Sequence, residues 1–300
     1  MILTVPSWLV PGTWLENLER ASRIGWVEGV ELLFFSYDAE ARSALAVELP
    51  GIARIAKALS LSVHLPDPLT AEAEELVSLT ADFAAAYIVH PPRLAASAPK
   101  DASKTPTSSG ALAYTHIASA VSHAPATAAA GLSNKSEWAR LVDALRGRYG
   151  DRFLLEYTDR EAFAAAERDI PGLPLCADTG RLLLDGEVPD AWIESRVDRV
   201  REVHLHGVEG RKDHAALRDG EVWLESLVAL LGASSTRVEL EIFSLAEVEA
   251  SAAVLRKIFA REGEARARVA RGNTTLGPAD RNNSANAPFH PAIKFEGGME

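Results

Sequence analysis

The sequence is short of cysteine, of basic residues and of long apolar runs, and each shortage excludes a class of protein. The single cysteine, Cys176, excludes an internal disulfide and is typical of a reducing cytoplasm. Its apolar neighbours predict a packing role. No apolar run reaches the roughly 18 residues of a membrane span, and the first residues lack a secretion signal. We therefore expect a soluble cytoplasmic protein without a membrane partner.

Basic side chains are too few for one common class of partner. Lysine and arginine number 31 against 42 aspartates and glutamates, which gives a net charge of −11. A broad nucleic-acid surface needs clustered lysine and arginine, so nucleic acid is not the expected partner. A small-molecule substrate held through metal ions faces no such restriction. The oligomeric state is left open.

Strand and helix patterns alternate along the chain. Apolar alternation predicts strands at 2–10, 29–35, 61–65, 86–90, 153–157, 175–178, 200–206 and 238–243. Helical periodicity predicts helices at 13–24, 51–59, 70–83, 135–149, 160–167, 189–197, 221–231 and 245–261. Eight such units in about 260 residues predict an α/β fold, a closed (β/α)8 TIM barrel. A doubly wound open sheet is the alternative.

Two segments interrupt this rhythm. Residues 91–134 are rich in Ala, Ser, Pro and Thr, and we interpret them as a long loop inserted over one face of the barrel. Residues 263–300 lose hydrophobic periodicity, which predicts a disordered tail. The prediction is a single barrel domain over residues 1–262.

The most informative stretch is 203–214, which holds three of the eight histidines and an aspartate. His204 and His206 lie two apart on a predicted strand and therefore share one face. Asp213 and His214 follow in the loop after it. Imidazole and carboxylate groups that converge at a strand end are what a divalent-metal site needs.

Polar residues recur near the ends of the other predicted strands. In strand order they are Glu31, His64, His90, Glu156, Asp178, His204 with His206, and Glu241. One such residue alone is more often a rim histidine or a salt-bridge partner than a ligand. In a barrel, however, these strand ends meet at one mouth. Burying that many carboxylates without a cation would be expensive, which favours a shared metal site.

Several strings resemble the xylose isomerase-like barrel superfamily, which includes the endonuclease IV group, and within it the cobamide-remodelling phosphodiesterases. They are SWLVP at 7–11, GVELLF at 29–34, LSVHLP at 61–66, LCADTG at 175–180 and HLHGV at 204–208, followed by Asp213 and His214. The similarity spans residues 2 to about 260, without the insertion. It implies hydrolysis of the phosphodiester in the nucleotide loop of an adenosylated cobamide, which releases cobinamide phosphate and the lower-ligand nucleoside.

The resemblance also implies roles for individual residues. The implied cofactor is one or more divalent ions, of zinc, manganese or iron, with the ligands His64, His90, Glu156, Asp178, His204, Asp213, His214 and Glu241. Glu156, Glu241 and Arg181 are the predicted catalytic residues. The predicted substrate contacts are His206, Arg181, Glu31 and Trp8.

Two residues depart from the family pattern. Arg181 stands where relatives have a histidine, and Tyr157 stands where they have an asparagine. Arginine stays protonated and cannot bind a cation, but it can hold a phosphate oxygen through two hydrogen bonds. The departures allow fewer ions, weaker binding or a different substrate.

Two other functions compete with the phosphodiesterase. A sugar isomerase or epimerase on the same fold would use Glu156 and Glu241 as proton-transfer acid and base around one cation. A non-catalytic corrinoid- or metabolite-binding protein would bind its ligand without turnover. A DNA-repair nuclease is disfavoured by the net charge of −11.

Overall fold

A parallel eight-stranded barrel forms the centre of the protein. The computed structural model describes residues 1–92, 136–232 and 234–273. Its barrel strands are β1 Ile2–Pro6, β2 Gly29–Leu33, β3 Ser60–His64, β4 Ala84–Val89, β5 Phe153–Glu156, β6 Leu175–Asp178, β7 Val200–His204 and β10 Arg237–Glu239. The closed order is β1-β10-β7-β6-β5-β4-β3-β2, with every neighbouring pair parallel. The predicted (β/α)8 barrel is confirmed.

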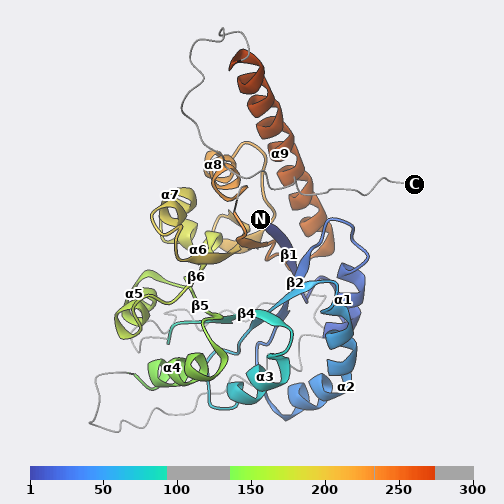
Figure 1. The fold of residues 1–300 in the computed structure, drawn as a ribbon, viewed down its shortest axis with the longest axis vertical. Helices are drawn as coiled ribbons and strands as arrows, with labels where there is room; N and C mark the ends of the chain where they lie inside the picture. Colours follow the sequence, from blue (N-terminus) through green and yellow to red (C-terminus); the bar gives the residue numbers. More distant parts are fainter. Residues whose placement is uncertain (93–135, 233, 274–300) are drawn as a thin grey trace.

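Helices surround the strands, as Figure 1 shows. They are α1 Trp14–Ala21, α2 Ala39–Ile55, α3 Ala73–Thr80, α4 Glu137–Tyr149, α5 Arg160–Asp169, α6 Thr179–Leu184, α7 Pro189–Glu194, α8 Val222–Leu231 and α9 Leu245–Asn273. Side-chain caps define several starts, because the Thr13, Ser136 and Asp159 side chains accept hydrogen bonds from amides of the first turn. The main core fills the layer between these helices and the strands.

The inside of the barrel is divided into an apolar part and a charged part. Ala86, Ile88, Leu154 and Cys176, from β4, β5 and β6, form a separate small apolar cluster. Cys176 is fully buried there, in agreement with a packing role. Buried glutamates on β2, β7 and β10 supply the charged part. The interior is therefore packed with side chains and is not a pore.

The structure differs from the sequence prediction in α2, in α6 and in the loop after β7. α2 begins at Ala39, well before the predicted 51–59, because the Asp38 side chain caps it and buried Leu45 and Ile52 anchor it on both sides of Pro50. The short α6 directly follows β6 and was not predicted. The predicted loop after β7 contains a two-stranded antiparallel hairpin, β8 Gly207–Glu209 and β9 Lys212–Ala215.

The last helix, α9, is also longer than predicted. α9 continues past the predicted end at 261 to Asn273, through a stretch rich in good helix formers. The outer part of α9 extends away from the barrel (Figure 1). The predicted insertion at 91–134 lies almost wholly outside the described residues, as does the tail from 274 onward. Within the described residues, no helix is both long enough and apolar enough to span a membrane.

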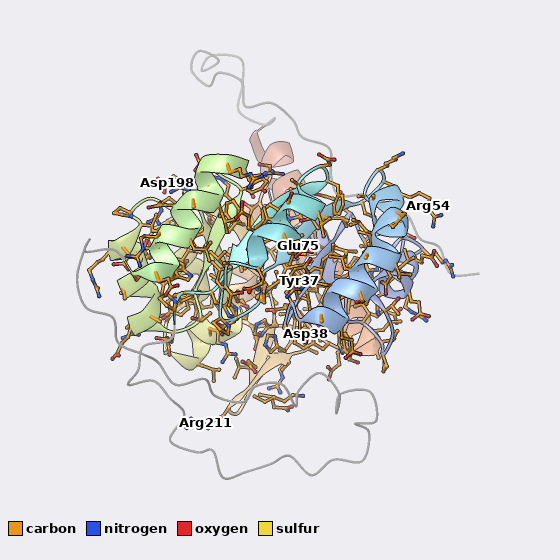
Figure 2. The ribbon with its side chains drawn as sticks, turned by 90° about the horizontal axis from the view of Figure 1, so that it is seen from below. Tyr37, Asp38, Arg54, Glu75, Asp198 and Arg211 are labelled. Atoms are coloured by element: carbon orange, nitrogen blue, oxygen red, sulfur yellow. The ribbon has the colours of Figure 1, made fainter. Side chains whose placement is uncertain are left out.

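The β8–β9 hairpin marks the end of the barrel that carries the polar strand ends. Its tip, at Arg211, lies at the opposite end of the barrel from Arg54 and Asp198 in Figure 2. Arg54 is in the last turn of α2 and Asp198 precedes β7, so both lie where the chain returns to the start of a strand. The hairpin therefore flanks the mouth formed by the carboxyl ends of the strands.

Candidate metal centre

Most of the predicted site residues lie at this mouth because the strands position them there. His64, Glu156, Asp178 and His204 are the last residues of β3, β5, β6 and β7. His90 directly follows β4, and Glu241 lies two residues after β10. Since the strands are parallel, all of these ends reach the same rim.

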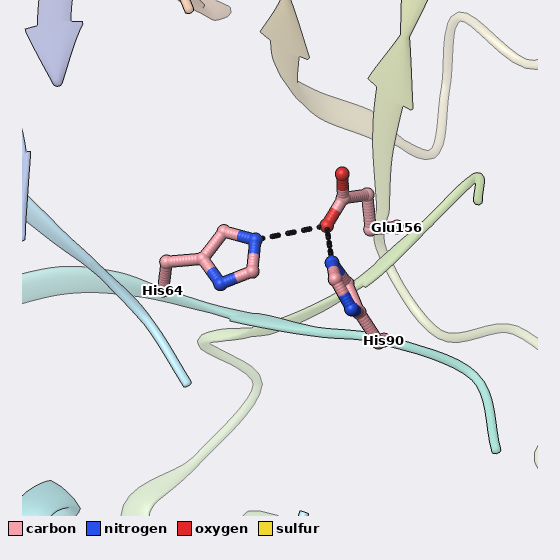
Figure 3. A group of neighbouring side chains, drawn as sticks. All are labelled: His64, His90 and Glu156. Atoms are coloured by element: carbon pink, nitrogen blue, oxygen red, sulfur yellow. Dashed lines mark hydrogen bonds and ion pairs between the residues drawn. The ribbon is translucent and has the colours of Figure 1, made fainter. Parts of the chain in front are cut away.

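One group joins His64, His90 and Glu156 (Figure 3). The Nε2 atoms of His64 and His90 lie 3.1 Å and 2.7 Å from Oε2 of Glu156. Burial alone would lower the pKa of His90, but Glu156 and Asp67 together raise it to about 10. Burial would likewise raise the pKa of Glu156, but positive charge on His90 and His204 holds it well below its usual range. The group therefore keeps Glu156 ionised.

A second group brings Glu156 and Glu241 to the same nitrogen of His204. Nδ1 of His204 lies 3.3 Å from Oε1 of Glu156 and 3.2 Å from Oε2 of Glu241. The ring is fully buried, and within the described part of the chain neither of its nitrogens has a hydrogen-bond partner. Two carboxylates thus approach one unpaired buried nitrogen.

A third group joins His206, His214 and Glu241. The peptide N–H of His214 donates to Nδ1 of His206 at 2.9 Å, so only Nε2 of His206 is left to face the centre. That Nε2 lies 3.0 Å from Oδ1 of Asp178. His214 has φ 51°, a left-handed conformation that costs a non-glycine residue about 1–2 kcal/mol. The strain places the His214 ring against His206, with the ring centroids 4.3 Å apart.

Gly180 makes room for His206, and sequence reasoning missed this. A Cβ atom at Gly180 would lie 2.1 Å from Cε1 of the His206 ring. Because His206 is fully buried, its ring has little room to move away.

We therefore expect Gly180→Ala to displace His206 and to weaken metal binding about 10- to 100-fold, measured by calorimetric titration of metal-free protein. Gly147→Ala is the matched control, since a Cβ at Gly147 on α4 meets nothing within 4 Å. Affinity at the wild-type level in Gly180→Ala would show that His206 does not depend on this contact.

The two departures from the family pattern have different structural outcomes. Arg181 lies at the mouth, where its guanidinium group pairs with Asp213 at 2.9 Å. Asp213, a predicted ligand, thus pairs with Arg181 and joins none of the histidine and carboxylate groups found among the described residues. Tyr157 faces the outer layer, where its hydroxyl donates to Asp185. The change at Tyr157 therefore leaves the centre intact.

Below the mouth, Glu31, Glu202 and Glu239 form an acidic floor with His204. All three glutamates are fully buried. Glu31, a predicted substrate contact, faces Nε2 of His204 at 3.4 Å inside the barrel. Burial raises the pKa of Glu239 well above its ordinary value, and the charge of Glu31 raises it further. Glu202 and Glu239 were not predicted.

Trp8, another predicted substrate contact, lies on the loop after β1. It is half-buried, and its ring meets the edge of Phe35 with centroids 6.5 Å apart. Phe35 is half-exposed. This pair forms an apolar surface after the ends of β1 and β2.

The donor atoms of the mouth fit a divalent metal. Nε2 of His206, both nitrogens of His204 and Oε2 of Glu241 are buried without a hydrogen-bond partner in the described ranges. Leaving such atoms unpaired is costly, and imidazole with carboxylate suits zinc, iron or manganese. Glu156 and Glu241 each belong to two of the groups, so each can serve neighbouring ions.

The chain matches no family model and no curated protein. Solved structures do match. A D-tagatose 3-epimerase-like protein aligns with a TM-score of 0.59 at 13% identity, over 88% of this chain and 99% of that one. The 3-keto-D-glucoside 4-epimerase of E. coli gives 0.52 at 13% identity over 87% and 99%. An AP endonuclease, family 2, from Brucella melitensis gives 0.51 at 15% identity over 83% and 95%.

The structural similarity to these proteins concerns the fold. The protein has the same closed (β/α)8 barrel fold as these neighbours. The names of the neighbours are those of sugar epimerases and of an endonuclease family. At such low identity the match concerns the fold, and the chemistry must be argued from the site.

Proposed function

We propose that this protein is a divalent-metal-dependent sugar isomerase or epimerase. The observation that carries the proposal is the position of Glu156 and Glu241, which approach His204 from β5 and from the residues after β10. Two carboxylates that converge on a cation-binding nitrogen can act as proton acceptor and proton donor on one substrate. The names of the two epimerase neighbours agree with this chemistry.

In this reaction the two glutamates would have different roles in proton transfer. Glu156, kept ionised by His64 and His90, accepts the proton from the carbon next to the substrate carbonyl. Glu241 in its protonated form returns a proton to the carbon skeleton, and return to the opposite face inverts the centre. A bound divalent ion would stabilise the negative charge that develops on the carbonyl oxygen. Arg181 and His214 at the mouth would position the sugar hydroxyls.

A metal-dependent phosphodiesterase is the second candidate, and the number of metal-binding groups favours it. Three groups share Glu156 and Glu241 along the mouth. Neighbouring ions can together stabilise the attacking and the leaving oxygen of a phosphodiester. Arg181 would add a guanidinium donor for a phosphate oxygen. The cobamide nucleotide loop is the substrate that the sequence resemblance favours for this chemistry.

One substrate panel separates the candidates. Metal-reconstituted protein is incubated in deuterium oxide with ketohexoses, aldohexoses and their 3-keto derivatives, and in parallel with adenosylcobalamin and bis(p-nitrophenyl) phosphate. We expect NMR to show deuterium incorporated at a carbon next to the sugar carbonyl. Protein treated with a chelator should no longer incorporate deuterium. Phosphodiester cleavage without sugar exchange would replace the first proposal with the second. Tight corrinoid binding without turnover on either set would contradict both.

A further inference from the structure

The acidic floor of the barrel is a separate feature from the mouth. Glu31, Glu202 and Glu239 come from β2, β7 and β10, and each offers an oxygen that lies within 4.8 Å of the others and of a nitrogen of His204. All four side chains are fully buried. No reaction step proposed above uses the three glutamates.

The charge of this floor is only partly neutralised. Arg237 pairs with Glu202, its Nε lying 3.2 Å from Oε1. Ser62 donates to Glu31 at 3.2 Å or to Glu202 at 3.1 Å. Glu239 has no hydrogen-bond partner on either oxygen within residues 1–92, 136–232 and 234–273. Burying an ionised carboxylate without a hydrogen bond is among the largest free-energy costs that a side chain can impose on folding.

A neutral carboxylic acid at Glu239 does not remove this difficulty. Its O–H would be a buried donor and would need an acceptor. Nε2 of His204 lies 3.5 Å from Oε2 of Glu239, yet neither atom takes part in a hydrogen bond within the described chain. Both oxygens of Glu239 therefore lie beside the cluster without a hydrogen bond in the described chain.

Several other buried polar atoms on this inner face make no hydrogen bond within the described residues. Beside Glu239, Oε1 of Glu31 and Oε2 of Glu202 are buried without a partner among the described residues. The hydroxyl of Thr4 is in the same state, with Thr4 fully buried. Thr4 is the register partner of Glu239, so its side chain lies on the same inner face of the barrel. Thr4 is an observation independent of the acids and also indicates a missing ligand.

We propose that Glu31, Glu202 and Glu239 hold a buried divalent cation of the carboxylate-preferring class, magnesium or manganese, beneath the mouth. Opposite ligands of such an ion lie about 4.2 Å apart, and one oxygen of each glutamate lies within 4.8 Å of the others. Three glutamates beside one arginine and one histidine leave negative charge that such an ion would balance. Oxygen donors in this proportion suit magnesium and manganese better than zinc.

His204 connects this floor site to the mouth. Its Nδ1 faces Glu156 and Glu241, and its Nε2 faces Glu31 and Glu239. With Nδ1 turned to the mouth, Nε2 would carry the ring proton and point it at Glu31 and Glu239, so glutamates held in place by the floor ion would fix the orientation of the ring, whatever reaction occurs at the mouth. The inference therefore goes beyond the proposed function and can stand if that function fails.

The test counts manganese ions. Metal-free wild-type protein, Glu239→Gln and Glu31→Gln are titrated with Mn²⁺, and bound ion is measured by mass spectrometry after gel filtration. We expect each variant to bind one ion fewer than wild type, while Glu241→Gln retains the floor ion. Glutamine keeps the size of the side chain and removes a buried charge, so folding should be preserved. Exposed Glu209→Gln on the hairpin is the control.

Thermal melting supplies a second readout. Excess Mn²⁺ should raise the melting temperature of wild-type and Glu241→Gln protein by about 5–10 °C, and that rise should be lost in Glu239→Gln. An unchanged ion count in both floor variants would overturn the proposal. So would a Glu239→Gln protein that melts above metal-saturated wild type, because Glu239 would then be an uncompensated carboxyl rather than a ligand.

Discussion

Replacing Glu156 with glutamine is expected to lower turnover by about 100- to 10,000-fold, the range that a positioned acid–base group contributes. Glu156 is the residue that joins the groups of the mouth, since His64, His90 and His204 all approach its carboxylate. The amide keeps the shape but cannot accept a proton. Metal affinity should fall in the same variant because two groups lose a shared ligand.

The matched control for this experiment is Glu167→Gln. Glu167 lies on α5 and pairs with Arg199 on the outer layer. Loss of the Glu167 charge should leave the turnover rate and the metal affinity unchanged. It should lower the free energy of unfolding by at most about 1 kcal/mol. Steady-state kinetics and metal titration measure both effects. Wild-type turnover in Glu156→Gln would remove Glu156 from the chemistry and leave its histidine partners with a structural role only.

Replacing Arg237 with methionine is expected to destabilise the fold by about 3–5 kcal/mol, the cost of breaking a buried ion pair from one side. Arg237 is almost fully buried at the floor of the barrel. Its guanidinium group contacts Glu202, Ser60 and Ser62. Without Arg237, the charge of the acidic floor is no longer balanced by an arginine. Urea denaturation monitored by circular dichroism measures the decrease in the free energy of unfolding.

Two further variants make this result interpretable. Arg54→Met removes an exposed arginine that pairs with Glu19, and it should cost no more than about 1 kcal/mol. The double variant Arg237→Met with Glu202→Gln should recover part of the loss, because the carboxylate that Arg237 balances is removed as well. A single Arg237→Met protein that unfolds at the wild-type urea concentration would mean that the floor needs no arginine.

The barrel could be predicted because each strand carries its own signal. Apolar alternation marked all eight strands, and β6 began and ended as predicted at Leu175–Asp178. The prediction extended β1, β7 and β10 past their ends. The residues after β7 and β10 continue the alternation, and backbone hydrogen bonds from Leu205 to Glu239 and from Leu240 to Thr4 still follow the strand ends.

The acidic floor was readable in principle and was missed. Glu202, His204 and His206 follow one another at period two, and so do Arg237, Glu239 and Glu241. A residue two positions before a strand-end ligand lies on the same inner face, one layer deeper. The prediction considered strand ends alone and therefore stopped at the mouth.

Other features depend on contacts that no spacing encodes. The pairing of Arg181 with Asp213 joins α6 to the β8–β9 hairpin. Glu31 sits on a strand like the predicted ligands, but its depth in the barrel becomes known only from the register of β2 against β1 and β3. These relations are tertiary, and the sequence gives no local signal for them.

The close approach of Gly180 to the His206 ring constrains how this protein can diverge. Because any side chain at 180 would occupy the volume of that imidazole, the two positions cannot vary independently. A homologue with alanine at position 180 would need a residue smaller than histidine at position 206, acquired before the alanine or together with it. Drift away from the present chemistry would therefore pass through paired replacements, and a lineage retaining this histidine keeps its glycine.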